Sequence, residues 1–297
     1  MVGAHGTGNR GRAAPMNMQL NVRRVRFGRG LRWLPAGAEL LFANPAPLAG
    51  VAALWLLVSL IAVVPVIGQG LLAVLTPLLT AGVLKACADI AAGRRPVPTT
   101  LFAAWSDPQK RGALLLVGLW GIAGSVIAVS ILAVWLGAQL EPEQLEAAMA
   151  SPETLATTLA ETAIGGGLLL AALAMAIVMA SMYFAIPLIM FGRAPVLASL
   201  FTSIRAVLFN FTAFLGLGVA VVLFVGALGL VMLVLASVLG IALGQFGAML
   251  IQVLFLLMTM FIQMVMAATQ YVAFRDVFEL PGDEKGDRDG DDDQLLA

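Results

Sequence analysis

The sequence predicts an all-α membrane protein, a polytopic bundle of six transmembrane helices arranged as three hairpins. Composition is the first reason: of the 297 residues, 61% are hydrophobic and 11% are charged, whereas a soluble domain carries about 25% charged residues. The second reason is that the apolar residues form six segments, each near the roughly 20 residues needed to cross a bilayer. The third is a repeated motif, which predicts an amphipathic cytoplasmic elbow before each hairpin.

The expected spans follow from the limits of the apolar segments. They cover about residues 48–66, then from a tight turn at 67–70 to 92, then 112–136, 164–191, 211–235 and 245–274. Another short turn is expected around Gly240. Pro77 and Pro187 lie inside the second and fourth segments, and we expect each of them to bend its helix without ending it.

The repeated motif reads Pro-Val-x-x-[Thr/Ser]-Leu-Phe. It occurs at residues 96–102 and 195–201, with a looser copy at 35–42. Each copy precedes a pair of apolar segments, so the motif predicts where a hairpin begins. Around the looser copy, the apolar side chains between Leu34 and Phe42 predict a short helix lying along the membrane interface. In that arrangement Trp33 lies at headgroup depth.

Lys and Arg residues occur in alternate connections between the expected spans. Seven arginines precede the first span, and four residues of this kind lie between spans two and three and two between spans four and five. The other three connections have no Lys or Arg, and the loop at 137–163 has only acidic charges. Because positively charged loops stay on the cytoplasmic side, both termini are expected to be cytoplasmic.

The charge and composition of the two ends separate them from the apolar part of the chain. Residues 1–19 read as a flexible basic leader, and Met16 and Met18 are alternatives to Met1 as the translation start. Residues 20–280 form the transmembrane domain. Residues 281–297 are rich in aspartate, and a segment with so little apolar surface to bury is expected to be a disordered acidic tail.

Several short motifs carry a resemblance to a known family. They are Trp33, Leu41-Phe42 with Asn44-Pro45, and the two Pro-Val-x-x-[Thr/Ser]-Leu-Phe elbows. With them, residues 20–280 resemble a family of six-span bacterial inner-membrane proteins, a domain of unknown function. That family is distantly similar to the membrane domain attached to some glycerophosphodiester phosphodiesterases. The resemblance implies the fold and a bacterial cytoplasmic (inner) membrane. It implies no activity, and no phosphodiesterase domain is present.

Polar residues on the last expected span share one helix face. At about 100° per residue they fall within roughly 40° of one another. The members of this glutamine row are Gln245, Gln252, Thr259, Gln263 and Gln270. Polar side chains inside a membrane need protein groups or water as partners. The row therefore fits hydrogen bonding between helices of the bundle, hydrogen bonding across a homodimer, or one wall of a polar pathway.

A second set of candidates is charged. Lys85 and Asp89 lie four residues apart near the cytoplasmic end of the second span, a spacing that predicts an ion pair. The alternative is a role in the entry of an ion or a substrate. The elbows also carry arginines that are candidates for contact with lipid headgroups: Arg94, Arg95, Arg193 and Arg205.

Sequence motifs of common enzymes are missing. There is no phosphate-binding Gly-x-x-x-x-Gly-Lys-[Ser/Thr] loop, no His-Glu-x-x-His and no Gly-x-Ser-x-Gly. His5 is the single histidine and Cys87 the single cysteine, which excludes a histidine-based metal site and an internal disulfide. We therefore expect no enzymatic activity, no cofactor and no metal.

Arginines beside membrane spans favour the bilayer and its anionic phospholipid headgroups as partners, rather than nucleic acid. The preferred hypothesis is a non-enzymatic membrane protein that binds lipid or a partner protein. The alternative is a small transporter or permease that uses the glutamine row. A homo-oligomer is left open, and no substrate is indicated.

Overall fold

The computed structural model describes residues 22–141, 143, 146, 150–151, 153–154 and 165–278. The leader at 1–19, the tail at 281–297 and most of the acidic loop lie outside these residues. The described chain is helical, with one isolated β-bridge between Val22 and Phe278. Its helices are α1 (Phe27–Ala43), α2 (Pro45–Ser59), η1 (Leu60–Val63), α3 (Ile67–Ala91), η2 (Pro98–Phe102), α4 (Pro108–Gln139), α7 (Gly165–Gly192), α8 (Val196–Phe209) and α9 (Phe211–Val277).

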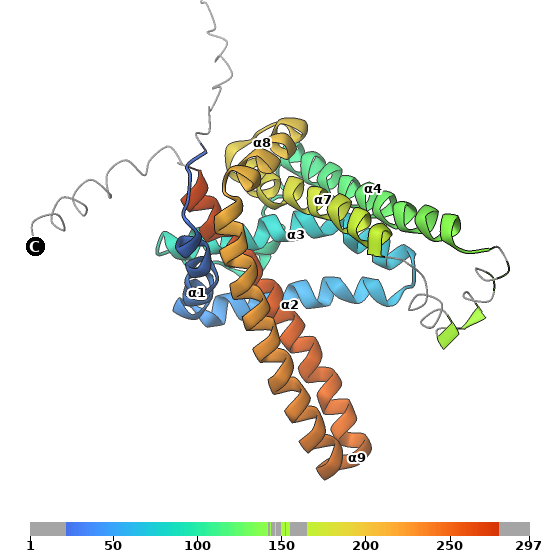
Figure 1. Ribbon diagram of the computed structural model, residues 1–297. Helices are drawn as coiled ribbons and strands as arrows, with labels where there is room; N and C mark the ends of the chain where they lie inside the picture. Colours follow the sequence, from blue (N-terminus) through green and yellow to red (C-terminus); the bar gives the residue numbers. More distant parts are fainter. Residues whose placement is uncertain are drawn as a thin grey trace, which may run out of the picture.

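Five of the described helical segments are long and apolar enough to cross a membrane. They are Pro45–Val63, α3, α4, α7 and α9. The last of them, α9, has 67 residues and consists of two helical arms, because Gly244 interrupts it with φ 56° and ψ −128°. Glycine accepts this positive φ without a steric cost. The chain therefore reverses at Gly244, a little beyond the turn expected around Gly240, and the two arms run side by side (Figure 1).

The turn between the first two apolar segments lies earlier in the chain than the sequence predicted. The expected turn at 67–70 is wrong, since α3 already begins at Ile67 and the reversal lies at Val64–Val66. Pro65 explains the difference. A proline disfavours the helical conformation of the residue before it, and Val64 accordingly adopts φ −78° and ψ 111°. Val66 then has a positive φ of 62°, which completes the turn.

The two strict copies of the repeated motif fold differently. The copy at 195–201 begins α8, a helix of 14 residues, whereas the copy at 96–102 forms only the five-residue 3₁₀ helix η2. The chain then restarts at Asp107, whose side chain caps α4 by accepting hydrogen bonds from the amides of Gln109 and Lys110. Asp107-Pro108 thus ends the elbow early. In both copies the motif leucine, Leu101 or Leu200, is buried, and the phenylalanine after it is more exposed.

The helix expected to lie along the membrane interface packs one of its faces against α9 and leaves the other exposed. Helix α1 contacts both arms of α9, and Trp33 is 1% exposed, so its indole packs against the protein; its depth in the membrane stays a prediction. Two glycines explain the packing. Gly30 and Gly37 face Ala213 on the first arm of α9 and Thr269 on the second, and a Cβ atom at either glycine would overlap these residues. Small residues allow helix backbones to approach this closely.

An aromatic cluster lies where α7 meets the two arms of α9. The ring of Phe184 on α7 lies 5.7 Å from that of Phe214 on the first arm and 5.2 Å from that of Phe278 at the end of the second. Phe184 and Phe278 are fully buried. Clusters of this kind combine a large buried apolar area with favourable edge-to-face contacts, so at this end of the bundle these rings join α7 to both arms of α9 within the core.

The chain before α1 is tied to the same end. The side chain of Asn210, between α8 and α9, accepts from the amide of Val25 (2.6 Å) and donates to the carbonyl of Arg23 (3.0 Å). The amide of Arg23 donates to the carbonyl of Val277 (2.9 Å). Residues 22–26 therefore act as a strap that joins the start of α9 to its end.

Asp276 closes this strap. Its carboxylate accepts two hydrogen bonds from Arg29, from Nε at 2.7 Å and from Nη2 at 2.8 Å. It also accepts one from the indole Nε1 of Trp33, at 2.7 Å. A bidentate pair between arginine and a carboxylate is the strongest geometry for such a contact. The three residues fix α1 against the last turn of α9.

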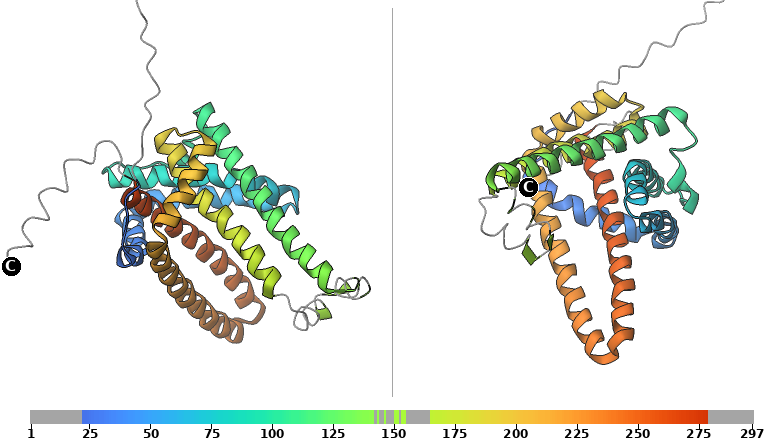
Figure 2. Two further views of the ribbon diagram at one scale, coloured as in Figure 1. Left: turned by 45° about the horizontal axis from the view of Figure 1, so that its top comes forward. Right: turned by 90° about the vertical axis from the view of Figure 1, so that its right-hand side faces the viewer.

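The helices pack tightly at this end and separate at the other. The far half of α9 projects away from the rest of the described chain (Figure 1; Figure 2, right). Its most apolar stretch of 18 residues has no residue buried within the structure. The α4–α7 pair extends in a different direction from α9 (Figure 2). The fold is therefore joined at one end and open at the other.

The strap yields a prediction. Replacing Asp276 with Ala leaves the buried indole N–H of Trp33 without its acceptor, and we expect the change to destabilise the folded protein by about 1 to 3 kcal/mol. Thermal unfolding in detergent measures the loss, and trypsin should cleave more rapidly within residues 23–29. The control is Glu39→Ala, which removes an exposed carboxylate from α1 that takes no part in the strap. Equal trypsin sensitivity of the two variants would contradict the role of Asp276.

Candidate functional site

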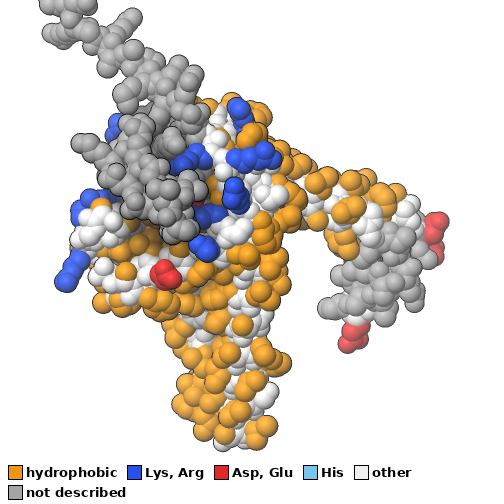
Figure 3. Space-filling view, turned by 60° about the vertical axis from the view of Figure 1, so that its left-hand side comes forward, with side chains coloured by type: hydrophobic (Ala, Val, Ile, Leu, Met, Phe, Trp, Pro, Cys, Tyr) orange, Lys and Arg blue, Asp and Glu red, His pale blue; other side chains and the backbone are white. Residues whose placement is uncertain are grey.

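Positive charge is concentrated at the end of the molecule where the helices meet. No Lys or Arg occurs at residues 33–84, 112–192 or 206–274, so the far ends of the long helices lack them. In the space-filling view, Lys and Arg side chains gather around this end, and acidic side chains lie at the far end of the α4–α7 arm (Figure 3). We call the end of the molecule where these Lys and Arg side chains gather the basic end.

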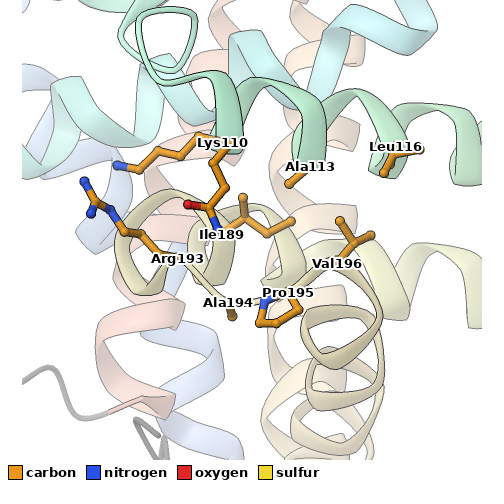
Figure 4. A pocket seen from close by; sticks show the side chains of 9 residues that line it. Lys110, Ala113, Leu116, Ile189, Arg193, Ala194, Pro195 and Val196 are labelled. Atoms are coloured by element: carbon orange, nitrogen blue, oxygen red, sulfur yellow. The ribbon is translucent and has the colours of Figure 1, made fainter. Parts of the chain in front are cut away.

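A pocket opens at the basic end between the start of α4 and the α7–α8 connection. It has a volume of about 230 Å³. Its lining combines two cations, Lys110 and Arg193, with the amide of Gln109 and with the apolar residues Ala113, Leu116, Ile189, Ala194, Pro195 and Val196. The two cationic side chains lie together at one end of the pocket, and Leu116 and Val196 lie at the other (Figure 4).

Local structure places both cations. Lys110 stands in the first turn of α4, which Asp107 caps. Arg193 follows the end of α7 and has a positive φ of 50°, which turns the chain sharply before Pro195 begins the second motif copy. The guanidinium of Arg193 lies 3.7 Å from the carboxylate of Asp107. Lys110 and Arg193 outnumber this one carboxylate, so the three residues together carry a net positive charge at the mouth of the pocket.

This arrangement suits an anionic amphiphile. Ammonium and guanidinium groups bind phosphate through charge-assisted hydrogen bonds, and the apolar wall beside them can contact a hydrocarbon chain. Pockets with a few convergent polar groups in a mainly apolar lining are typical ligand sites. Lys110 was not among the residues that the sequence suggested for headgroup contact, because its proximity to Arg193 depends on how α4 packs against α7.

The other candidate arginines are placed differently. Arg94 donates from Nε (2.9 Å) and Nη2 (2.6 Å) to Asp89, so its charge is used within the protein. Arg95 and Arg205 are exposed and do not line the pocket. The structure thus brings only Arg193, of the four, into the pocket.

Lys85 and Asp89 form the ion pair that their spacing indicated. The ammonium of Lys85 lies 2.5 Å and 2.6 Å from the two carboxylate oxygens of Asp89. With Arg94 on the same carboxylate, the group forms a three-residue network at the end of α3. A charged pair near the end of a span is less costly than one at its centre, and the network leaves the mostly buried carboxylate with two partners.

Gln270 is the one member of the glutamine row that is buried and bonded to another helix. Its side-chain amide Nε2 donates to the backbone carbonyl of Tyr183 on α7. Pro187 explains why that carbonyl is available. In a helix the carbonyl of residue 183 accepts from the amide of residue 187, but proline has no amide hydrogen. Gln270 therefore supplies the donor that Pro187 lacks.

A serine on α8 also forms hydrogen bonds with the backbone in the same region of α7. The hydroxyl of Ser203 accepts from the amide of Phe184 (2.8 Å) and donates to the carbonyl of Ala180 (2.5 Å). It is thus inserted into the hydrogen bond that these two backbone groups would form with each other. Insertion of a side chain into the helical ladder is a recognised cause of helix bending. Side chains from two neighbouring helices, α8 and α9, thus bond to the backbone of α7 in this region.

The remaining members of the row are not covered. Gln245, Gln252, Thr259 and Gln263 are exposed, and the hydroxyl of Thr259 donates to the carbonyl of Phe255 in its own helix (2.9 Å). The structure therefore divides the row. Gln270 is an internal hydrogen-bonding residue at the basic end, and the other four lie on an open face of the second arm of α9.

Comparison of the chain with protein-family models, with curated proteins and with solved structures finds no match.

The repair of α7 yields a prediction. Gln270→Leu leaves the buried carbonyl of Tyr183 without a donor and should cost about 1 to 3 kcal/mol of stability. In a Pro187→Ala background, residue 187 regains its amide hydrogen and can bond to that carbonyl itself. The same Gln270→Leu change should then cost much less, a coupling that a double-mutant cycle of unfolding in detergent measures. Equal costs in both backgrounds would contradict this role of Gln270.

Proposed function

We propose that the chain is a six-span protein of a bacterial inner membrane that binds anionic phospholipid at the cytoplasmic side. In this proposal the spans form three hairpins, α2 with α3, α4 with α7, and the two arms of α9. The basic end and both chain termini are cytoplasmic. The observation that carries the proposal is the pocket in which Lys110 and Arg193 stand beside an apolar wall.

The charge distribution supports the orientation. The far ends of the three hairpins lack Lys and Arg, whereas the basic end carries them on several helices. Positively charged residues near spans stay on the cytoplasmic side, where the membrane surface is also anionic. A pocket at this end would thus meet the anionic lipids that its charges favour.

The chemistry of the pocket supports the ligand class. A phosphodiester with one negative charge fits between an ammonium and a guanidinium, and the glycerol and the first part of an acyl chain would lie against Leu116 and Val196. Such binding needs no catalytic group, in keeping with a non-enzymatic role. The transporter alternative gains no support from the glutamine row, because four of its members are exposed and the fifth is bonded to α7.

The orientation is testable by cysteine labelling. In a Cys87→Ala background, we expect a cysteine at Ser106, in the connection before α4, to react with an impermeant maleimide only after the cells are opened. A cysteine at Ser151, in the acidic loop, should react from the periplasmic side in intact spheroplasts. The reverse pattern would overturn the proposed topology.

Lipid binding is testable with purified protein in detergent. Native mass spectrometry should show a preference for phosphatidylglycerol over phosphatidylcholine. Removing two charges with Lys110→Gln and Arg193→Gln should weaken phosphatidylglycerol binding about 30-fold, because each basic residue near anionic lipid contributes about 1 kcal/mol. Inorganic phosphate and glycerol phosphate, added as competitors, show whether the acyl chain contributes.

The matched control removes two other exposed charges from the same end, Arg95→Gln with Arg111→Gln. These residues do not line the pocket. If this control weakened binding as much as the pocket variant, general electrostatic attraction rather than the pocket would account for the preference. If neither variant changed the preference for phosphatidylglycerol, the proposal would be wrong.

A further inference from the structure

The open face of α9 has an unusual composition for a surface that contacts lipid. Gln245, Gln252 and Gln263 are exposed on it, and each carries a carboxamide with donors and acceptors. Hydrocarbon chains offer no hydrogen-bond partner, and polar groups left unpaired in an apolar medium are costly. Together with the membrane topology proposed above, this means that the face needs a protein partner.

Contacts made by other residues of the second arm of α9 show which way its glutamine row faces. On one side, Phe261 packs against Phe42 of α1 and Phe224 of the first arm of α9, with ring centroids 6.2 Å and 6.3 Å apart. The glutamine row lies about 160 to 200° around the helix from Phe261, so it faces away from the first arm. Gln270 on the same row contacts α7. Nearer the turn α9 diverges from α7 (Figure 2), and the row is left open.

The spacing of the open row matches the seam of a two-stranded coiled coil. In a heptad repeat, successive d positions are seven residues apart, and the next a position follows a d position after four. By this spacing the d positions are Gln245, Gln252 and Thr259, and Gln263 is an a position. The intervening a positions hold Met249 and Leu256, which are 63% and 46% exposed. From Gln245 to Gln263 the seam is about 27 Å long, close to the roughly 30 Å of a hydrocarbon core.

We propose that this seam is the interface with a second copy of the chain. Both copies have the same orientation in the membrane, so a two-fold axis along the membrane normal makes the two helices parallel and in register. Gln252 of one copy then faces Gln252 of the other, and each carboxamide both donates and accepts. A second copy provides partners at the required spacing along the whole row by symmetry, and polar residues at seam positions specify such a register.

The hydrogen bond already made by Gln270 illustrates the chemistry. Where a neighbouring helix covers the row, the glutamine side chain bonds to it. The second copy would provide the same for the part of the row that no helix of this chain covers. The inference depends on the topology in the proposed function but not on lipid binding in the pocket.

Disulfide cross-linking in native membranes tests the interface. In the Cys87→Ala background, a single cysteine at Gln252 should form a dimer under mild oxidation at least tenfold faster than one at Leu257. Leu257 is 53% exposed and lies about 140° around the same helix from Gln252, so it controls for random collision.

A second measurement keeps the side chains in question. Single-molecule photobleaching of the protein at low density in liposomes should show dimers. Gln245→Leu with Gln252→Leu should weaken dimerisation at least tenfold while leaving Gln270, and so the repair of α7, intact. The matched control is Gln69→Leu with Gln139→Leu, which removes two exposed glutamines that lie outside the row.

The possible results are distinct. Faster cross-linking at 252 together with loss of dimers in the row variant supports the interface. Monomers at every protein density, equal cross-linking at 252 and 257, or dimers that persist in the row variant would each overturn it. The topology on which the interface depends is measured separately by the maleimide labelling at Ser106 and Ser151, and the pocket by phosphatidylglycerol binding of the same variants. Failure of the interface is therefore distinguishable from failure of the proposed function.

Discussion

The carbonyl of Tyr183 is the constraint on which the packing of the basic end depends. Pro187 deprives it of its helical donor, and an unpaired carbonyl inside a membrane protein is costly. Gln270 supplies the missing hydrogen bond from α9, and Ser203 supplies two more to the adjoining backbone from α8. A local defect in one helix thereby joins three helices. The aromatic cluster around Phe184 packs at the same level and encloses the repaired region.

The tightly joined basic end contrasts with the hairpins that spread from it. At the basic end the helices are held by hydrogen bonds that differ at each contact, such as those of Asn210 and Asp276. Farther away the helix surfaces are mainly apolar, and the most apolar stretch of α9 has no buried residue. Lipid can cover apolar surfaces without loss, because the hydrophobic effect does not drive helix association in a bilayer. The exposed glutamines of the row on α9 are unsuited to lipid, and a second copy of the chain is the partner that we propose for them.

The repeated motif shows how one short sequence serves two purposes. Its leucine is buried in both strict copies, so the common role is to fix the elbow onto the bundle. The residues after it decide the rest. Asp107-Pro108 starts α4 immediately after the first copy, whereas the second copy continues into α8. This difference places Lys110 at the start of α4 beside Arg193 and the first residues of α8, and the pocket exists because the two elbows are not equivalent.

Hydrophobicity, charge and i,i+4 spacing are local properties. From them the helical class, most segment limits, the concentration of positive charge and the pairing of Lys85 with Asp89 could be predicted. The sequence did not place the first turn correctly, since the conformations of Val64 and Val66 near Pro65 overrode the apolar pattern. Tertiary structure alone decided that Trp33 is buried, that Lys110 meets Arg193, and that Gln270 is bonded while Gln252 is exposed. Periodicity places side chains on a face of a helix, but which neighbour covers that face depends on packing between distant segments.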